Sequence, residues 1–217
     1  MTNREFDAAL FDIDGTVLDT TSYILQAYQH TFRLHLDREI TWEEVVPVMG
    51  LPLIECYRHL ANLQEVDHLI VSHNEFQYQN LSLAVAYPNT LNTLIVLAGK
   101  GVGLGAITSR YGDQVTETLR MTGIGDHFQV IVTPLDVVKP KPDAESVVKA
   151  LEYLKVSPER AVMIGDSPFD ILAGKSAGTK TIGALYGFHG QSLTEVKPDY
   201  LVNDISEIIP IIIGGKQ

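Results

Sequence analysis

The pattern of hydrophobic positions divides the chain into two regions. From about residue 88 onward, short apolar or β-branched runs alternate with segments whose apolar residues recur at helical spacing. This alternation is typical of a parallel sheet covered by helices. With one more strand near the N-terminus, it predicts an α/β fold with a doubly wound parallel sheet. The expected strands are Ala8–Phe11, Val102–Ile107, Phe128–Val132, Ala161–Ile164 and Thr179–Ile182, and the expected helices are Thr90–Ala98, Asp113–Met121, Ala144–Leu154 and Phe169–Ala177.

Residues 16–86 show successive helical stripes and no alternating strand pattern. One of these stripes contains Val66, Leu69, Ile70, His73 and Phe76. Thr41 is followed three residues later by Glu44, which is the spacing of a capping box at a helix start. We therefore expect two units, an α/β core formed by residues 1–15 and 87–217 and an all-helical cap domain formed by residues 16–86. The histidines of this second unit have no metal-binding spacing and are interpreted as core or surface residues.

The composition limits the possible partners. The 217 residues carry a formal charge of −11, and the Lys and Arg residues are scattered, so the long-range field repels nucleic acid. A small phosphate ester remains possible, because a bound metal ion and one or two local cations can reverse the potential within a site. The single cysteine, the polar N-terminus and the lack of a long apolar run predict a cytoplasmic protein without disulfides or a membrane partner, as a monomer or dimer.

Polar residues follow four of the predicted strands. In an open α/β sheet, ligands bind beyond the carboxyl ends of the strands, so these residues are the candidates for chemistry. The first strand ends in Asp12-Ile-Asp14-Gly-Thr, the second in Thr108-Ser109-Arg110, and the fourth in Gly-Asp166-Ser167-Pro-Phe-Asp170, while Lys139-Pro-Lys141-Pro follows the third.

Each of these pieces has a structural explanation when it is taken alone. The Asp-x-Asp-Gly-Thr run fits an Asx turn, Thr108 fits a strand end, and the Lys-Pro-Lys-Pro run fits an exposed loop. Ser167 and Asp170 fit a capping box at the start of a helix. Together, the pieces supply what a phosphoryl group and Mg²⁺ require, because Asp12 and Asp166 offer oxygen ligands and the hydroxyl and ammonium groups can hold phosphoryl oxygens.

As an ordered set, these four motifs resemble those of the haloacid dehalogenase superfamily of aspartyl-phosphate phosphatases. The resemblance covers essentially the whole chain. It implies a core sheet with strand order 5-4-1-2-3, counted over the five predicted strands, and a helical cap inserted just after the first motif. It also implies Mg²⁺ as the cofactor and a small phosphorylated metabolite as the substrate.

The resemblance also assigns roles to individual residues. It implies that Asp12 is the nucleophile and that Asp14 acts as general acid and base. The Asp12 carboxylate, the Asp14 backbone carbonyl and Asp166 are the implied metal ligands. Thr108 and Lys139 are expected to hold the phosphoryl oxygens.

Further residues are expected around this centre. Asp170, with Ser167 beside it, is expected to orient Lys139 or metal-bound water. Lys141 is the rival for the lysine role, but the family places its lysine before the first proline, which favours Lys139. Ser109 stands where close relatives often have Asn, and it is expected to line the phosphate pocket.

Substrate choice is expected to lie in the cap. The loop Val48–Pro52, with Gly50 at its centre, resembles a substrate-facing loop, and a plain helix connection remains the alternative. If the leaving group carries a carboxylate, Arg58 or Arg110 is the expected partner.

Asp14 favours a phosphatase or phosphomutase, since superfamily members that attack carbon or cleave phosphonates lack an acid at this position. The chain most resembles the phosphoglycolate phosphatase-like group and a related bacterial inorganic pyrophosphatase. We expect hydrolysis of a small phosphomonoester such as 2-phosphoglycolate, with inorganic pyrophosphate as a rival substrate. The remaining alternatives are a phosphomutase of the β-phosphoglucomutase type and, outside enzymes, a phosphoaccepting signalling module.

Overall fold

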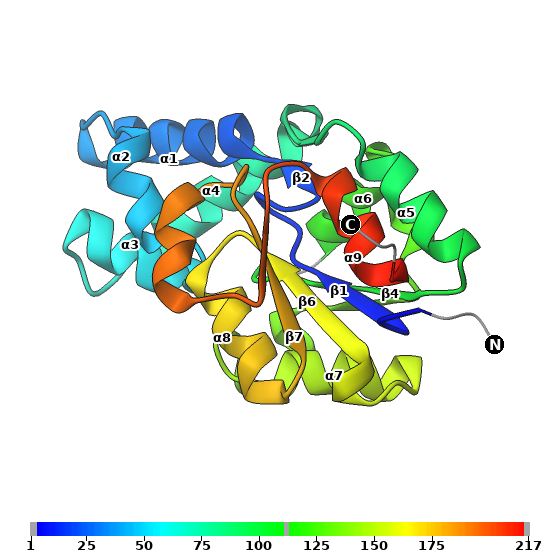
Figure 1. The fold of residues 1–217 in the computed structure, drawn as a ribbon. Coiled ribbons are helices and arrows are strands. Elements are labelled where there is room, and N and C mark those ends of the chain that lie inside the picture. Colours follow the sequence, from blue (N-terminus) through cyan, green and yellow to red (C-terminus); the bar gives the residue numbers. More distant parts are fainter. Residues whose placement is uncertain (1–3, 111–112, 215–217) are drawn as a thin grey trace.

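A six-stranded, all-parallel sheet forms the centre of the protein (Figure 1). The structure is a computed structural model that describes residues 4–110 and 113–214. Its strand order, β5-β4-β1-β6-β7-β8, contains the expected order of the five predicted strands and adds one edge strand, β8. The strands are β1 Ala8–Phe11, β4 Gly103–Ile107, β5 Val130–Val132, β6 Ala161–Gly165, β7 Lys180–Ala184 and β8 Tyr200–Val202.

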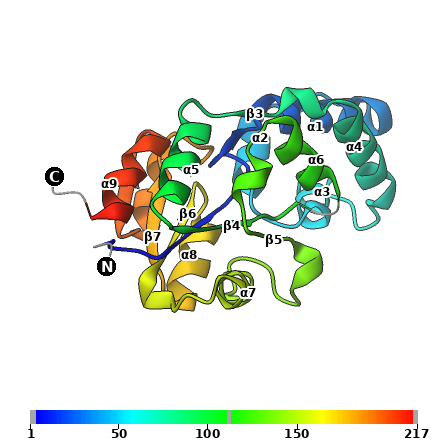
Figure 2. The ribbon, with the colours of Figure 1, turned by 90° about the vertical axis from the view of Figure 1, so that its right-hand side faces the viewer.

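Helices cover both faces of the sheet, because alternate residues of its central strand point to opposite sides. Ala8 and Leu10 of β1 pack in one hydrophobic cluster with α7 (Glu145–Leu154) and α8 (Pro168–Ala177). Ala9 and Phe11 pack on the other side, where the covering helices are α5 (Thr90–Gly99), α6 (Asp113–Met121) and α9 (Ile208–Ile213). Figure 2 shows these two layers from the side. The doubly wound α/β fold is therefore confirmed.

A group of helices interrupts the core between its first two sheet strands and forms what we call the helical insertion (residues 16–86). Its helices are α1 Thr21–Leu36, α2 Trp42–Val45, α3 Leu53–Ala61 and α4 Asp67–Gln79. A short antiparallel ribbon of β2 (Leu18–Asp19) and β3 (Val85–Ala86) connects it to the core. The insertion has its own hydrophobic cluster, centred on Tyr23, Tyr28, Phe32, Tyr57 and Leu69. The predicted capping box of Thr41 and Glu44 begins α2.

Short 3₁₀ helices complete the connections: η1 Val46–Val48, η2 Leu81–Leu83, η3 Gly125–His127, η4 Pro134–Asp136, η5 Pro158–Arg160, η6 Gly190–Val196 and η7 Ile205–Glu207. No helix among the described residues has both the length and the apolarity needed to cross a bilayer.

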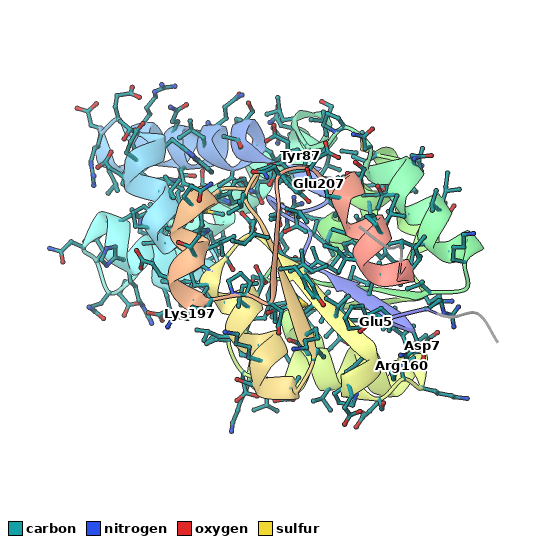
Figure 3. All side chains as sticks on the ribbon, viewed as in Figure 1. Glu5, Asp7, Tyr87, Arg160, Lys197 and Glu207 are labelled. Atoms are coloured by element: carbon teal, nitrogen blue, oxygen red, sulfur yellow. The ribbon has the colours of Figure 1, made fainter. Side chains whose placement is uncertain are left out.

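The two ends of the sheet have different roles. At the amino end of β1, Asp7 and Arg160 form an ion pair with an N···O distance of 3.0 Å, and Figure 3 shows this pair on the side away from the insertion. At the carboxyl ends, β1, β4 and β6 run toward the helical insertion (Figure 1). The polar residues that follow these strands therefore lie between the sheet and the insertion.

Candidate active site

Asp12 lies directly after β1 and is buried, with 6% of its surface exposed. Its backbone N–H donates to the carbonyl oxygen of Ile164, which continues the pairing of β1 with β6. Its carboxylate Oδ1 accepts a hydrogen bond from Lys141 Nζ at 2.6 Å. The same ammonium donates to Asp170 Oδ1 at 2.6 Å and to the carbonyl oxygen of Ile107, the last residue of β4, at 3.3 Å. Lys141 thus connects the ends of three chain segments around Asp12.

Asp170 uses its two carboxylate oxygens for two partners. Oδ2 accepts hydrogen bonds from the Ser167 backbone N–H at 3.0 Å and from the Ser167 hydroxyl at 2.7 Å. The Asp170 N–H in turn donates to Ser167 Oγ, which completes the predicted capping box at the start of α8. Because Oδ1 also holds Lys141, Asp170 orients a lysine, although not the one that the sequence analysis selected.

Asp166 follows β6 and is 2% exposed. Its Oδ2 accepts a hydrogen bond from the Phe188 backbone N–H at 2.7 Å, and no described residue donates to Oδ1. Gly15 and Gly187 approach Asp166 so closely that a Cβ atom on either glycine would overlap it. Gly15 also has φ of +83°, a conformation that side chains with a Cβ rarely adopt. The backbone is therefore shaped around this carboxylate.

Electrostatics at this cluster are governed by burial and by like charges. Burial, followed by the charge of Asp170, raises the pKa of Asp12 to about 8, and Lys141 opposes this shift. Burial, followed by the charge of Asp12, raises the pKa of Asp166 well above its usual range. Burial disfavours the ammonium form of Lys141, but the Asp12 and Asp170 carboxylates outweigh burial and raise the pKa of Lys141. The lysine stays charged, and the raised pKa values show that this one cation is not enough to keep both Asp12 and Asp166 ionised.

This donor set fits a hard divalent cation. One carboxylate oxygen from each of Asp12, Asp166 and Asp170 lies within 4.8 Å of the other two. Asp14 adds a fourth acid, and the only cations in contact with these acids among the described residues are Lys141 and Arg110. The formal charge of the site is therefore −2. Buried carboxylates that lack a counter-charge are costly, and a divalent ion would balance them. Since both oxygens of Asp170 are engaged, Asp12 and Asp166 are the side chains with free ligand capacity.

Asp14 points toward a different partner. The Arg110 guanidinium binds its carboxylate with two groups, Nε to Oδ2 at 2.8 Å and Nη2 to Oδ1 at 2.5 Å. The same guanidinium lies over the ring of Tyr23 on α1, 4.7 Å from the ring centroid, and Nη1 donates to the Thr118 hydroxyl of α6. Arg110 thus connects the proposed general acid with both the core and the helical insertion.

The structure does not bring Lys139, the predicted phosphoryl-binding lysine, to the carboxylate cluster, and Lys141 lies there instead. The backbone N–H groups of Val138 and Lys139 donate to the carboxylate of Glu145, at 2.8 and 2.9 Å. This arrangement holds the loop at the surface, where Lys139 is exposed, whereas Lys141 is 7% exposed and turned inward. Lys141, the rival residue for the lysine role, is therefore the lysine that contacts Asp12 in the structure.

Arg58, a predicted partner of the leaving group, does not line the cavity between the sheet and the insertion. Arg58 is partly exposed on α3, where it pairs with Glu55 at 2.9 Å and donates to the Gln64 carbonyl oxygen. It faces solvent because the buried side of α3 is formed by Cys56 and Tyr57.

The remaining predicted residues lie at or beside the cluster. Ser109, Arg110, Gly50 and Ser167 line a cavity between the sheet and the insertion. Gly50 has φ of +97°, and a Cβ at this position would overlap the ring of Phe169 at the start of α8. Thr108 is buried directly after β4, and its hydroxyl accepts a hydrogen bond from the Arg110 N–H at 3.0 Å.

The cavity has a volume of about 610 Å³, and its floor contains Asp12, Asp14, Lys141 and Asp166. Several lining residues are not among the predicted site residues, including His73 of α4 and Phe188 of the loop after β7. His73 belongs to a predicted apolar stripe, and its polarity within that stripe was the available signal. Phe188 carried no signal, because its contribution to the site is a backbone N–H.

This fold and this cluster identify the class of the protein. A sequence profile described as haloacid dehalogenase-like hydrolase matches residues 9–184, and the chain belongs to this family. Among individual proteins, the chain is 37% identical over 213 residues to "Pyrophosphatase PpaX" of Bacillus velezensis, covering 97% of this chain and 98% of the relative. It is 34% identical over 214 residues to the protein of the same name from Bacillus pumilus, covering 98% and 99%.

Solved structures agree in fold. A crystal structure described as that of a predicted phosphoglycolate phosphatase from Haemophilus somnus has a TM-score of 0.87 at 21% identity, covering 95% of this chain and 98% of that one. CbbY from Rhodobacter sphaeroides, in complex with phosphate, has a TM-score of 0.82 at 24% identity, covering 94% and 96%. At these identities, the likeness supports the fold alone.

Proposed function

We propose that this haloacid dehalogenase-like phosphatase hydrolyses a small phosphomonoester through an aspartyl-phosphate intermediate on Asp12, with Mg²⁺ as cofactor. The observation that carries the proposal is the bridge that Lys141 forms between Asp12 and Asp170, with Asp166 beside them. An ammonium group held against a buried carboxylate suits a reaction in which negative charge is transferred to that carboxylate.

In the first half-reaction, a carboxylate oxygen of Asp12 attacks phosphorus. The bond from phosphorus to the leaving oxygen breaks, and Asp14 gives its proton to that oxygen, so an alcohol departs. Lys141 stays beside the reacting carboxylate and offsets the charge that the phosphoryl oxygens bring. The product of this step is a phosphorylated Asp12.

In the second half-reaction, water attacks the phosphorus atom of phospho-Asp12. Asp14 now takes a proton from that water, the bond between phosphorus and the Asp12 oxygen breaks, and inorganic phosphate leaves. In the structure, Arg110 holds both oxygens of the Asp14 carboxylate, which is the ionised form that accepts the proton from water. One of these contacts has to open before Asp14 carries a proton to the leaving oxygen.

The proposed holders of Mg²⁺ are the carboxylates of Asp12 and Asp166, together with the Asp14 backbone carbonyl that the family resemblance implies. When bound, the ion would supply positive charge that stabilises the ionised nucleophile and the phosphoryl oxygens. The net charge of the cluster and the free oxygen of Asp166 support this assignment.

Phosphate release from a panel of phosphorylated metabolites tests the proposal, with and without Mg²⁺. We expect turnover that chelation abolishes and Mg²⁺ restores, and a phosphorylated protein that denaturation traps and mass spectrometry detects. Asp12→Asn should lose at least about 10³-fold in kcat, since the nucleophile is removed. Release of phosphate by Asp12→Asn at the wild-type rate would refute the role of Asp12.

Inorganic pyrophosphate is a second candidate substrate, because two relatives of nearly equal length are named pyrophosphatases. Parallel measurement of kcat/KM for pyrophosphate and for 2-phosphoglycolate separates the two. Isomer formation from a sugar phosphate without net phosphate release would indicate a mutase. A phosphorylated state that persists for many minutes without any substrate turnover would indicate a signalling module.

A further inference from the structure

The helical insertion contributes no cation to the cavity. Its sequence contains no lysine and three arginines. All three arginines pair with glutamates on the outer surface, Arg33 with Glu39, Arg38 with Glu44 and Arg58 with Glu55. None of them lines the cavity.

The two cations on the core side of the cavity already have partners. Lys141 is held between two aspartates, and Arg110 binds Asp14 through two nitrogen atoms. A leaving group with its own negative charge, such as a second phosphate or a carboxylate, would meet no available positive charge among the described residues that line the insertion side. Desolvating such an anion without a counter-charge is costly.

What the insertion does supply is an apolar wall and uncharged polar side chains, among them His73 and Gln77 of α4. The wall includes Ile24, Tyr28, Met49, Leu51, Ile54 and Ile70. His73 and Gln77 lie one turn apart on α4, line the cavity and are buried, with 2% and 6% of their surfaces exposed. No described residue forms a hydrogen bond with the Gln77 side-chain amide or with His73 Nε2. Both residues line the cavity, so these unpaired polar groups are available to a ligand that enters it.

His73 is held in one orientation and in its neutral form. Its Nδ1 shares a hydrogen bond of 2.8 Å with the Tyr57 hydroxyl, which leaves Nε2 for a ligand. The rings of Tyr28 and Tyr57 meet the imidazole edge to face, with centroid distances of 4.8 and 5.5 Å. Burial, with a smaller effect of the charge on Arg110, lowers the pKa of His73 to about 3. An imidazole in this state offers a hydrogen bond without adding charge.

We propose that the leaving group of the substrate is an uncharged organic alcohol, whose apolar part packs against the insertion and whose second oxygen substituent bonds His73 and Gln77. The inference rests on the proposed phosphatase function and narrows its substrate class. The cavity volume of about 610 Å³ falls in the range of sites that enclose organic ligands. The inference also selects against both inorganic pyrophosphate and 2-phosphoglycolate as preferred substrates.

A matched series of aryl phosphates tests the charge preference. We measure kcat/KM for phenyl phosphate, 3-(hydroxymethyl)phenyl phosphate and 3-carboxyphenyl phosphate, with pyrophosphate and 2-phosphoglycolate alongside. The hydroxymethyl ester should exceed the carboxyl ester and pyrophosphate by about 10²-fold, the size expected for leaving an anion without a partner. Preference for a charged substrate overturns this inference and leaves the phosphatase function intact, whereas absence of turnover on every ester refutes the phosphatase function.

Variants of α4 test the two polar residues. His73→Leu should lower kcat/KM for the hydroxymethyl ester by about tenfold, which is the loss expected for one hydrogen bond. The kcat/KM for phenyl phosphate, which lacks the second oxygen substituent, should change less than twofold. His68→Leu, on the exposed side of the same helix, is the matched control and should change neither. An equal loss on both esters in His73→Leu would indicate a structural role and overturn the assignment of His73.

A gain of charge provides an independent test that does not depend on losing activity. Gln77→Arg introduces a cation into the insertion side of the cavity. We expect the ratio of kcat/KM for 3-carboxyphenyl phosphate to that for phenyl phosphate to rise about tenfold, as expected for one new charged contact. An unchanged ratio in a variant with wild-type melting temperature would overturn the claim that a missing cation sets the preference.

Discussion

The two sides of the cavity are built on different principles. On the core side, charged residues from strand ends far apart in the sequence meet one another, as when Lys141 reaches Asp12 across 129 positions. On the insertion side, each arginine pairs with a glutamate no more than six positions away and turns outward, as in the contact of Arg33 with Glu39. The sheet thus concentrates charge where strands end, and the helices keep charge off the surface that meets the substrate.

This difference suggests that phosphoryl transfer and substrate selection are assigned to opposite sides of one cavity. The charged side suits the transfer of a phosphoryl group, whose charge is the same for every ester. Under the proposed function, the uncharged side would contact the part of the substrate that varies between esters. Exchanging residues between the two sides, or comparing chemically matched residues across them, gives direct ways to test this division.

The largest expected effect contrasts the two lysines of one loop. Lys141→Gln should lower kcat by about 10²- to 10³-fold, because it removes the cation beside the proposed nucleophile. Lys139→Gln should stay within twofold of the wild type, since that lysine is exposed. Steady-state kinetics with a saturating aryl phosphate measure both, with circular dichroism as a check of folding. Equal losses in the two variants would contradict the placement of Lys141.

A second contrast uses the arginines Arg110 and Arg58. Arg110→Gln should reduce kcat by about 10- to 100-fold, the range expected for losing a charged two-point contact to Asp14. It should also move the pH profile of kcat, because the environment of the proposed proton donor changes. Arg58→Gln should leave both unchanged. If Arg110→Gln alters KM alone, its contact with Asp14 has no part in proton transfer.

The third prediction concerns stability and the buried histidine. In the folded chain the pKa of His73 is about 3, below its usual value of 6.5. As the pH falls below that usual value, the unfolded chain binds a proton that the folded chain does not, so the folded state loses stability. Between pH 7 and pH 5 this linkage should remove about 2 kcal/mol from the free energy of unfolding.

Urea denaturation at the two pH values measures this loss. His73→Leu should lack it, and His68→Leu should keep the wild-type difference between the two pH values. The same pH difference in wild type and His73→Leu would show that His73 is protonated equally in both states, and would contradict its neutral form in the cavity.

The smallest expected effect lies at the junction of the two sides. Gly50→Ala should lower the free energy of unfolding by about 1 kcal/mol, or a few degrees in melting temperature, because φ is positive and Phe169 occupies the added volume. Gly99→Ala in α5, where a Cβ meets nothing within 4 Å, should leave the melting temperature unchanged or slightly higher. A Gly50→Ala variant as stable as Gly99→Ala would show that the junction tolerates displacement.

Most of the core could be predicted from the sequence, because its signals are local. Apolar runs and helical stripes define the sheet strands and the helices α5 to α8 to within a few residues. The edge strand β8 escaped prediction, since its three residues include an exposed leucine and have no clear apolar run. Capping boxes at α2 and α8 were predictable because they depend on two residues three apart.

The candidate site was predictable in its parts and less so in its geometry. The strand ends indicated which acids meet, but the Lys-Pro-Lys-Pro run cannot reveal which lysine points inward. Glu145 decides this, by binding two backbone N–H groups from a helix that starts six residues after Lys139. The helical stripe containing His73 likewise marks a buried face without telling whether that face meets other helices or a cavity.

Asp170 contacts two partners at once, and this links the formation of α8 to the position of Lys141. One oxygen of its carboxylate initiates α8, and the other aims the ammonium of Lys141 at Asp12. When this helix forms, the same event therefore positions the charge that the reaction needs. Under the proposed function, fraying of the first turn of α8 would therefore release Lys141 from Asp170 and lower activity.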